Sequence, residues 1–131
     1  MTLVELRAFV RDAFPVVFDE PPLVKARVGD ETVGFALIQY GEQSCVLLMV
    51  EICPELGLSP ARALELNRDL GPASLVPVCG QYLLRQVMPL DQATGPAVRW
   101  TCTYLARTAT RLRQQLVRPV YQAAFYAQYV D

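Results

Sequence analysis

Residues 58–90 read LSPARALELNRDLGPASLVPVCGQYLLRQVMPL, and they contain a capped helix followed by a pair of strands. Ser59 followed by Pro60 is typical of a helix start, because a serine oxygen accepts from free N–H groups and proline suits the first helical position. Gly71, which is followed by another proline, is typical of a helix end. The sequence therefore predicts a helix over residues 60–70.

Two strands are predicted after this helix, over residues 74–79 and 81–89, with a turn at Gly80. Pro77 has no backbone N–H, so the first of these strands is expected at an edge of the sheet or at a bulge. Three further strands are predicted upstream. Short turns that contain glycine and acidic residues separate them, which favours an antiparallel meander. These three strands occupy residues 23–28, 32–40 and 44–52.

Helices are also predicted at both ends of this region. Thr2 and Glu5 form a capping box, and apolar residues recur at helical spacing up to Pro15, which predicts a helix over residues 2–14. A long helix follows the last strand, and Pro119 is predicted to end it. One apolar seam runs along this helix through Val98, Cys102, Leu105, Ala109, Leu112 and Leu116.

Residues 119–131 form an aromatic extension. Tyr121, Phe125 and Tyr129 recur at every fourth residue, the spacing of a short amphipathic helix. Packing against the domain or against a second copy is favoured for these rings over stacking on a ligand. The predicted order is α-β-β-β-α-β-β-α, an α+β sandwich with an antiparallel sheet flanked by helices. It makes up one domain over residues 1–118, and the short C-terminal helix is added to it.

Composition excludes several classes of function. The 131 residues are 53% hydrophobic and include no histidine, so disorder and every mechanism that needs the chain's own imidazole are excluded. The glycines never cluster as a phosphate-binding loop. Four widely spaced cysteines favour reduced structural thiols over a zinc site. We therefore expect a protein without catalytic residues, metal or cofactor, and a thiol-dependent or unrecognised enzyme stays as a third alternative.

Charge is distributed unevenly along the chain. Residues 1–69 carry eleven acids and six bases, a net charge of -5, whereas residues 70–131 carry two acids and six arginines, a net charge of +4. The total of -1 argues against nucleic acid or anionic membranes as partners. No uncharged apolar run is long enough to span a bilayer, and the first residues lack the pattern of a signal peptide. We therefore expect a cytoplasmic protein.

Residues 64–70, LELNRDL, place a leucine-asparagine pattern on the capped helix, and the next hairpin ends in Pro89-Leu90 before the long helix. In this order the chain resembles the type III secretion chaperone-like superfamily, which includes secretion chaperones and bacterial YbjN-type proteins. The resemblance implies a homodimer joined around the second helix or the neighbouring strand, a function in protein binding, and no catalytic residues. Two alternatives stay open: a chaperone that holds or regulates a client protein, and a YbjN-type regulatory or structural homodimer without a client groove.

The strands over residues 32–40 and 44–52 are apolar on both faces. In the first, Phe35 alternates with Ala36 and Ile38, and the second alternates in the same way. Such a sheet needs helices on both sides, a dimer mate or a bound client. Complete coverage by the chain's own helices and aromatic extension stays open, beside strand addition by a client at an exposed edge.

Ten residues are candidates for a partner or dimer surface. An arginine stripe on the long helix consists of Arg99, Arg107, Arg111 and Arg118. A solvated face is favoured for it over an acidic protein partner or RNA, while the aromatic rings nearby favour a contact surface. Glu51 interrupts an apolar strand, and an exposed strand end is favoured over a buried site carboxylate. The ten candidates are Leu64, Asn67, Leu75, Trp100, Tyr104, Arg107, Arg111, Tyr121, Phe125 and Tyr129.

Overall fold

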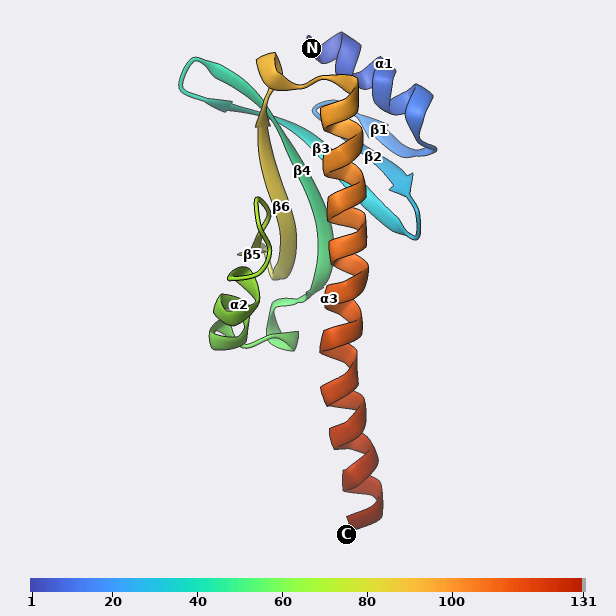
Figure 1. Cartoon of the computed structure of the whole chain (residues 1–131), viewed down its shortest axis with the longest axis vertical. Helices are drawn as coiled ribbons and strands as arrows, with labels where there is room; N and C mark the ends of the chain where they lie inside the picture. The colour runs from blue at the N-terminus through green and yellow to red at the C-terminus, as the bar shows by residue number, and fades with distance from the viewer. Residues whose placement is uncertain (131) are drawn as a thin grey trace.

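The computed structural model describes the backbone of residues 1–130 and the side chains of residues 1–116. Its longest helix crosses a curved sheet (Figure 1). The helices are α1 (Leu3–Ala13), α2 (Pro60–Asn67) and α3 (Gly95–Val130), with short 3-10 turns at Glu55–Gly57 and Leu90–Gln92. The strands are β1 (Val16–Glu20), β2 (Leu23–Val28), β3 (Glu31–Tyr40), β4 (Gln43–Pro54), β5 (Ser74–Val78) and β6 (Gln81–Pro89).

The sheet has six strands in the order β1-β2-β3-β4-β6-β5, and every neighbouring pair is antiparallel. All five predicted strands are present, which confirms the meander and the second hairpin. The additional strand is β1, where the pattern predicts only a turn. Its short hydrophobic run stands between Pro15 and a Pro21-Pro22 pair, so local signals resemble those of a loop. Pairing with β2, which is a tertiary interaction, makes it a strand.

Helix starts agree with the sequence more closely than helix ends. Thr2 and Glu5 form both hydrogen bonds of the capping box, and the Ser59 hydroxyl accepts from the backbone of Arg62 at 3.2 Å. α2 ends at Asn67, three residues earlier than predicted. The next two N–H groups donate to carbonyls three residues back, so the helix tightens into turns before it reaches Gly71.

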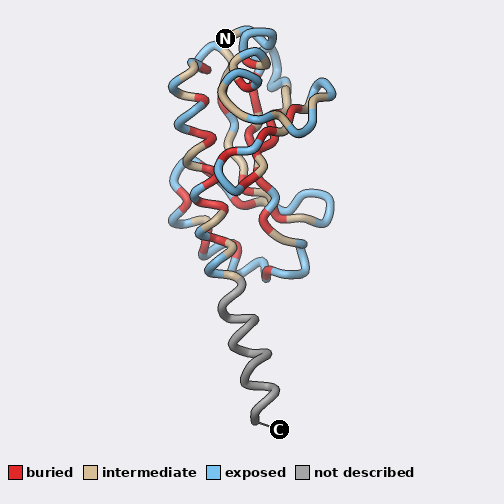
Figure 2. The backbone as a smooth tube through the Cα atoms, turned by 90° about the vertical axis from the view of Figure 1, so that its right-hand side faces the viewer, coloured by how far each residue is buried: buried red, intermediate tan, exposed pale blue. Residues whose placement is uncertain are grey.

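The core lies between one face of the sheet and the helices. Val33 and Phe35 from β3 and Leu48 and Val50 from β4 are buried there. The predicted seam of α3 is confirmed from Val98 to Leu112, and these residues are at most 2% exposed. Buried residues of α1 and α2 join the same core cluster. Figure 2 shows buried positions recurring along α3 and along the strands beside it.

The structure differs from the sequence prediction at Pro119. α3 is a single helix to Val130, so residues 120–130 continue it and do not form a separate helix. Proline within a helix removes one backbone hydrogen bond but leaves those of the neighbouring turns, so it does not always end the helix. The side chains of Tyr121, Phe125 and Tyr129 lie outside the described residues. Packing of the extension on the domain or a dimer mate stays a prediction.

Candidate functional site: the helix-free face of the sheet

The second face of the sheet carries a continuous apolar row. Ala36 pairs with Leu23 on one side and Leu47 on the other, and Leu47 pairs with Val87, so the row crosses four strands. Its side chains are half-buried or exposed, and none belongs to the core cluster that the described helices form. We call this surface the helix-free face. Its apolar residues are Leu23, Ala36, Ile38, Leu47, Met49, Val76, Leu83 and Val87.

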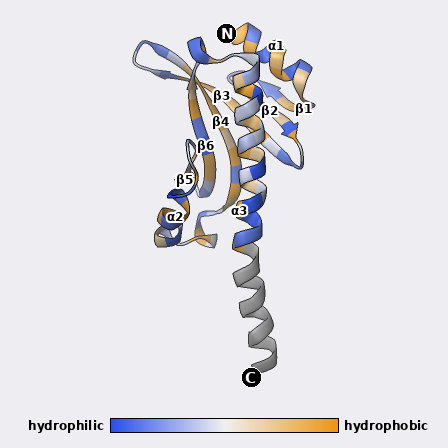
Figure 3. Cartoon of the chain, in the orientation of Figure 1, coloured by the Kyte–Doolittle hydropathy of each residue, from blue (hydrophilic) through white to orange (hydrophobic). Residues whose placement is uncertain are grey.

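Both predicted apolar faces are therefore present, but the described helices cover only one of them. Consecutive residues show the contrast: Leu48 is completely buried under the helices, whereas Leu47 and Met49 on either side point to the helix-free face. Figure 3 shows that β4 is hydrophobic along most of its length, as expected for a strand with two apolar faces. Side chains beyond Leu116 are not described, so the statement applies to residues 1–116.

A hollow of about 540 Å³ lies on this face. Its floor includes Met49 and Gly34, which are cross-strand partners. A Cβ atom at Gly34 would lie 3.2 Å from the Met49 side chain, so glycine lets the two strands carry a large residue at this point. Charged residues of both signs surround the apolar floor, namely Lys25, Arg27, Asp30 and Glu51. The arrangement combines an apolar contact surface with polar groups that can fix the orientation of a ligand.

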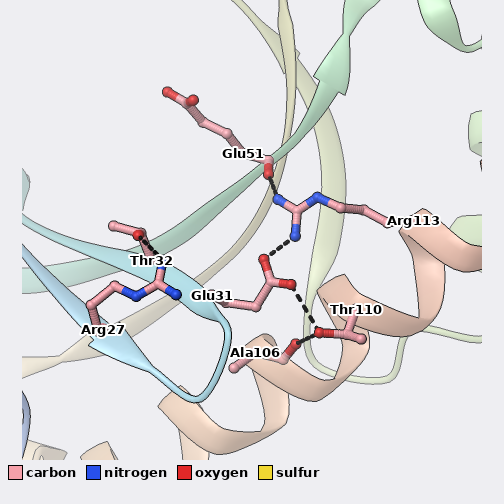
Figure 4. A network of polar contacts seen from close by, with 7 residues as sticks. All are labelled: Arg27, Glu31, Thr32, Glu51, Ala106, Thr110 and Arg113. Atoms are coloured by element: carbon pink, nitrogen blue, oxygen red, sulfur yellow. Dashed lines mark hydrogen bonds and ion pairs between the residues drawn. The ribbon is translucent and has the colours of Figure 1, made fainter.

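An ion pair between the buried Glu31 and the partly exposed Arg113 holds one end of the hollow to α3 (Figure 4). The Glu31 carboxylate accepts from the Thr110 hydroxyl at 2.8 Å and pairs with Arg113, which also donates to the backbone carbonyl of Glu51. Partial burial lowers the pKa of Arg113. The Glu51 side chain points away from this network and is exposed, which confirms the predicted exposure to solvent. β4 continues to Pro54, so Glu51 is not at a strand end as predicted. These contacts fix the sheet against the helix and leave the hollow open.

The two edges of the sheet differ in what they offer a partner strand. At β5, the Asn67 side chain accepts from the Leu75 N–H at 2.7 Å and donates to the Leu75 carbonyl at 2.9 Å. Since backbone groups alternate in direction, the next outward position is Pro77, which has no N–H. The β5 edge therefore has no free outward donor over these residues. The β1 edge is the other edge of the sheet, and strand addition by a client stays a prediction for that edge.

This geometry corrects one of the surface candidates. Leu75 is 2% exposed and belongs to the core, because its side chain points to the helix-covered face. Both polar groups of the Asn67 side chain are occupied inside the chain, and its place in a contact surface stays a prediction. Leu64, by contrast, is 69% exposed on α2, as a contact residue would be. The sequence pattern had no signal for the Asn67 pairing, since it joins a helix to a strand.

Four other candidates lie together on α3, away from the helix-free face. Trp100, Arg107 and Arg111 are exposed, and Trp100 stacks on the half-buried Tyr104 with ring centroids 5.2 Å apart. The sequence also failed to identify the apolar row of the helix-free face as a set, although the alternation of β3 and β4 was visible. Its register across four strands depends on tertiary pairing.

An apolar groove of about 320 Å³ also lies on the covered side, between α1 and the sheet. Leu6 and Val10 of α1 face Phe35 and Val24 across it, and Arg7 is the one charged residue in its lining. The sequence indicated the apolar side of this helix but not a gap beneath it. Core residues line one part of the groove, and half-buried or exposed residues line the rest. The apolar row on the other face crosses four strands, so we take that face as the main candidate site.

The cysteines differ in burial, and Cys79 is exposed. Cys45 and Cys102 are buried, and all four cysteines are free. Burial raises the pKa of Cys102 to about 12 and also raises that of Cys53, which disfavours the reactive thiolate. Among the described residues, no group of three potential metal ligands lies together. None of the described helices combines the length and apolar character needed to cross a membrane.

Comparison with known proteins identifies the fold. No protein-family model matches the sequence, and no curated protein matches it. Among solved structures, a chain in the HopA1-SchA chaperone-effector complex is similar, with a TM-score of 0.62 and 19% sequence identity. The match covers 82% of this chain and 88% of the other. The chain therefore has a type III secretion chaperone-like fold, as the pattern of residues 58–90 implied.

Proposed function

We propose that this protein is a non-enzymatic binding module that holds a segment of a partner protein against the helix-free face. The observation that carries the proposal is the row from Leu23 to Val87, which is apolar, crosses four strands and lies outside the core. Contiguous exposed apolar surface marks interaction sites in soluble proteins. The similar chain comes from a chaperone-effector complex, which supports a partner that is itself a protein.

The surface suits an extended or helical segment with apolar residues on one side. Burial of such residues stabilises a complex by about 25 cal/mol per Å² of apolar area removed from water. The charged residues around the hollow, Lys25, Arg27, Asp30 and Glu51, would pair with polar groups at the sides of the segment. Because the charges have both signs, they favour one orientation of the bound segment and do not simply attract any segment of opposite charge. A cytoplasmic location is part of the proposal.

A homodimer without a client is the second candidate, as in the YbjN-type alternative. Leu64 supports it, because this leucine is 69% exposed on α2 beside the edge strand β5. The dimer implied by the family resemblance is joined in the same region. A homodimer through α2 is compatible with client binding on the helix-free face, whereas a dimer through the helix-free face itself would replace the client.

Site-specific photo-crosslinking distinguishes these candidates. A photoreactive amino acid at Leu47 reports contacts of the helix-free face, and the same amino acid at Leu56, a fully exposed residue in the Glu55–Gly57 turn, is the matched control. We expect a defined adduct with another protein from position 47 and not from position 56. With that protein purified, Leu47→Lys should weaken binding at least about tenfold, since a lysine charge would enter an apolar contact.

Two results would contradict the proposal. If both positions gave the same adducts, the crosslinks would report chance encounters. If position 47 crosslinked to a second copy alone, the helix-free face would be a dimer interface, and the homodimer candidate would replace the client candidate.

A further inference from the structure

A second surface, on the side of α3 that faces away from the sheet, has features of a contact site. It consists of Trp100, Tyr104, Arg107 and Arg111, which surround a hollow of about 420 Å³ with two threonines. We call it the α3 outer surface. The tryptophan is the only one in the chain and is 58% exposed. Large exposed aromatic residues and arginines are enriched at protein interfaces.

The aromatic part of this surface is held in place before any partner arrives. The rings of Trp100 and Tyr104 are nearly parallel, with an interplanar angle of 5°. The Tyr104 hydroxyl donates to the Leu70 carbonyl just after α2. Gly71 permits this approach, because its φ is +61° and a Cβ atom there would lie 3.0 Å from the tyrosine oxygen. The two rings are therefore ordered before binding, so this protein loses little side-chain entropy when a partner binds.

The two arginines of this surface take part in no ion pair with another described residue. The ion pairs among described residues involve Arg7, Arg11, Arg62 and Arg113, and neither Arg107 nor Arg111 takes part in one. Arg99, which belongs to the predicted stripe, packs instead over the rings of Phe9 in α1 and Phe14 directly after it. Among the described members of the stripe, Arg99 thus makes intramolecular contacts, whereas Arg107 and Arg111 are exposed. Arg107 and Arg111 supply the positive charge of the α3 outer surface, and Glu65 and Asp69 line a neighbouring hollow with Arg111.

We propose that the α3 outer surface binds an acidic segment of another protein. Carboxylates of the segment would contact the guanidinium groups of Arg107 and Arg111, and one apolar or aromatic side chain would lie in the hollow beside Trp100. An acidic peptide fits better than RNA, because two arginines neutralise only a short negative segment and the net charge repels a long polyanion. The inference does not depend on the proposed function, since the helix-free face lies on the other side of the sheet.

The single tryptophan makes the test direct. Trp100 emission is followed while the full-length protein is titrated with a short peptide rich in glutamate that contains one phenylalanine. A second peptide has glutamine in place of every glutamate. We expect a saturable change with the acidic peptide, weakened by salt, and none with the glutamine peptide. Arg107→Gln combined with Arg111→Gln should weaken binding by about tenfold, from two exposed charge-assisted contacts.

The matched control is Arg11→Gln combined with Arg85→Gln, which removes the same charge at positions that line neither the α3 outer surface nor the hollow of the helix-free face, and it should leave the titration unchanged. Equal loss in this control would mean that net charge alone drives binding, and equal response to the glutamine peptide would exclude charge recognition. Tighter binding of a single-stranded RNA oligonucleotide, with the same dependence on Arg107 and Arg111, would overturn the choice of a protein partner. A saturable Trp100 change on raising protein concentration alone would identify a self-interface and would also overturn it.

Discussion

Asn67 joins a helix to the edge of the sheet through both polar groups of its side chain. Asn67→Ala leaves the N–H and the carbonyl of Leu75 without these partners. We expect a loss of about 1–3 kcal/mol in the free energy of unfolding, measured by urea denaturation. Leu64→Ala on the exposed side of α2 is the control and should change stability by less than about 0.5 kcal/mol. Equal effects of the two substitutions would show that the amide contacts do not stabilise the fold.

Asp19 makes the stability of the folded protein depend on pH in the acidic range. Hydrogen bonds from Arg11 and Arg7 lower its pKa below the ordinary 3.8. A group whose pKa is lower in the folded protein contributes its full stabilisation when the pH is above the pKa of the unfolded protein. This contribution is lost as the pH falls through the pKa of the folded protein. The stability difference between wild type and Asp19→Asn should therefore be constant well above pH 3.8 and shrink below it. A difference that does not change with pH would contradict the role of this carboxylate.

Single residues could be predicted only where their signal is local. The exposure of Leu64 and Trp100 and the caps at Thr2 and Ser59 follow from helix position and side-chain type. The burial of Leu75 does not, because it depends on which face of an edge strand meets the helices. Long-range pairs such as Glu31 with Arg113 leave no pattern in one sequence, since the partners are 82 positions apart.

Helices and strands, like single residues, could be predicted where their signal is local and not where they depend on tertiary contacts. Strands β2 to β6 and the starts of α1 and α2 have strong periodicity or capping signals, and all are present. β1 has a short hydrophobic run and becomes a strand through its pairing with β2. Pro119 is a strong local signal for a helix end, yet α3 continues past it. Local propensity is a weak prior that the rest of the molecule can override.

For the whole molecule, strands with two apolar faces indicate that the sheet needs a layer on each side. The described helices supply such a layer on one face only, so the hydrophobic surplus divides between a core and an open surface. The sequence could show that both faces are apolar, but it could not show which face the helices cover. That choice depends on how α1, α2 and α3 pack together. Because the described helices pack on one face, the hydrophobic residues of the other face form the candidate binding site.

We would measure the free energies of unfolding of Leu47→Lys and Leu48→Ala to test whether the helix-free face is open in the protein alone. These neighbours lie on one strand and point to opposite faces, with Leu48 completely buried. Leu48→Ala should cost about 2–5 kcal/mol, as in other cores. Leu47→Lys should cost less than about 1 kcal/mol, because the lysine can extend from an open face into water. If Leu47→Lys were as destabilising as Leu48→Ala, the face would be covered in the protein alone, and it would not be the partner-binding site.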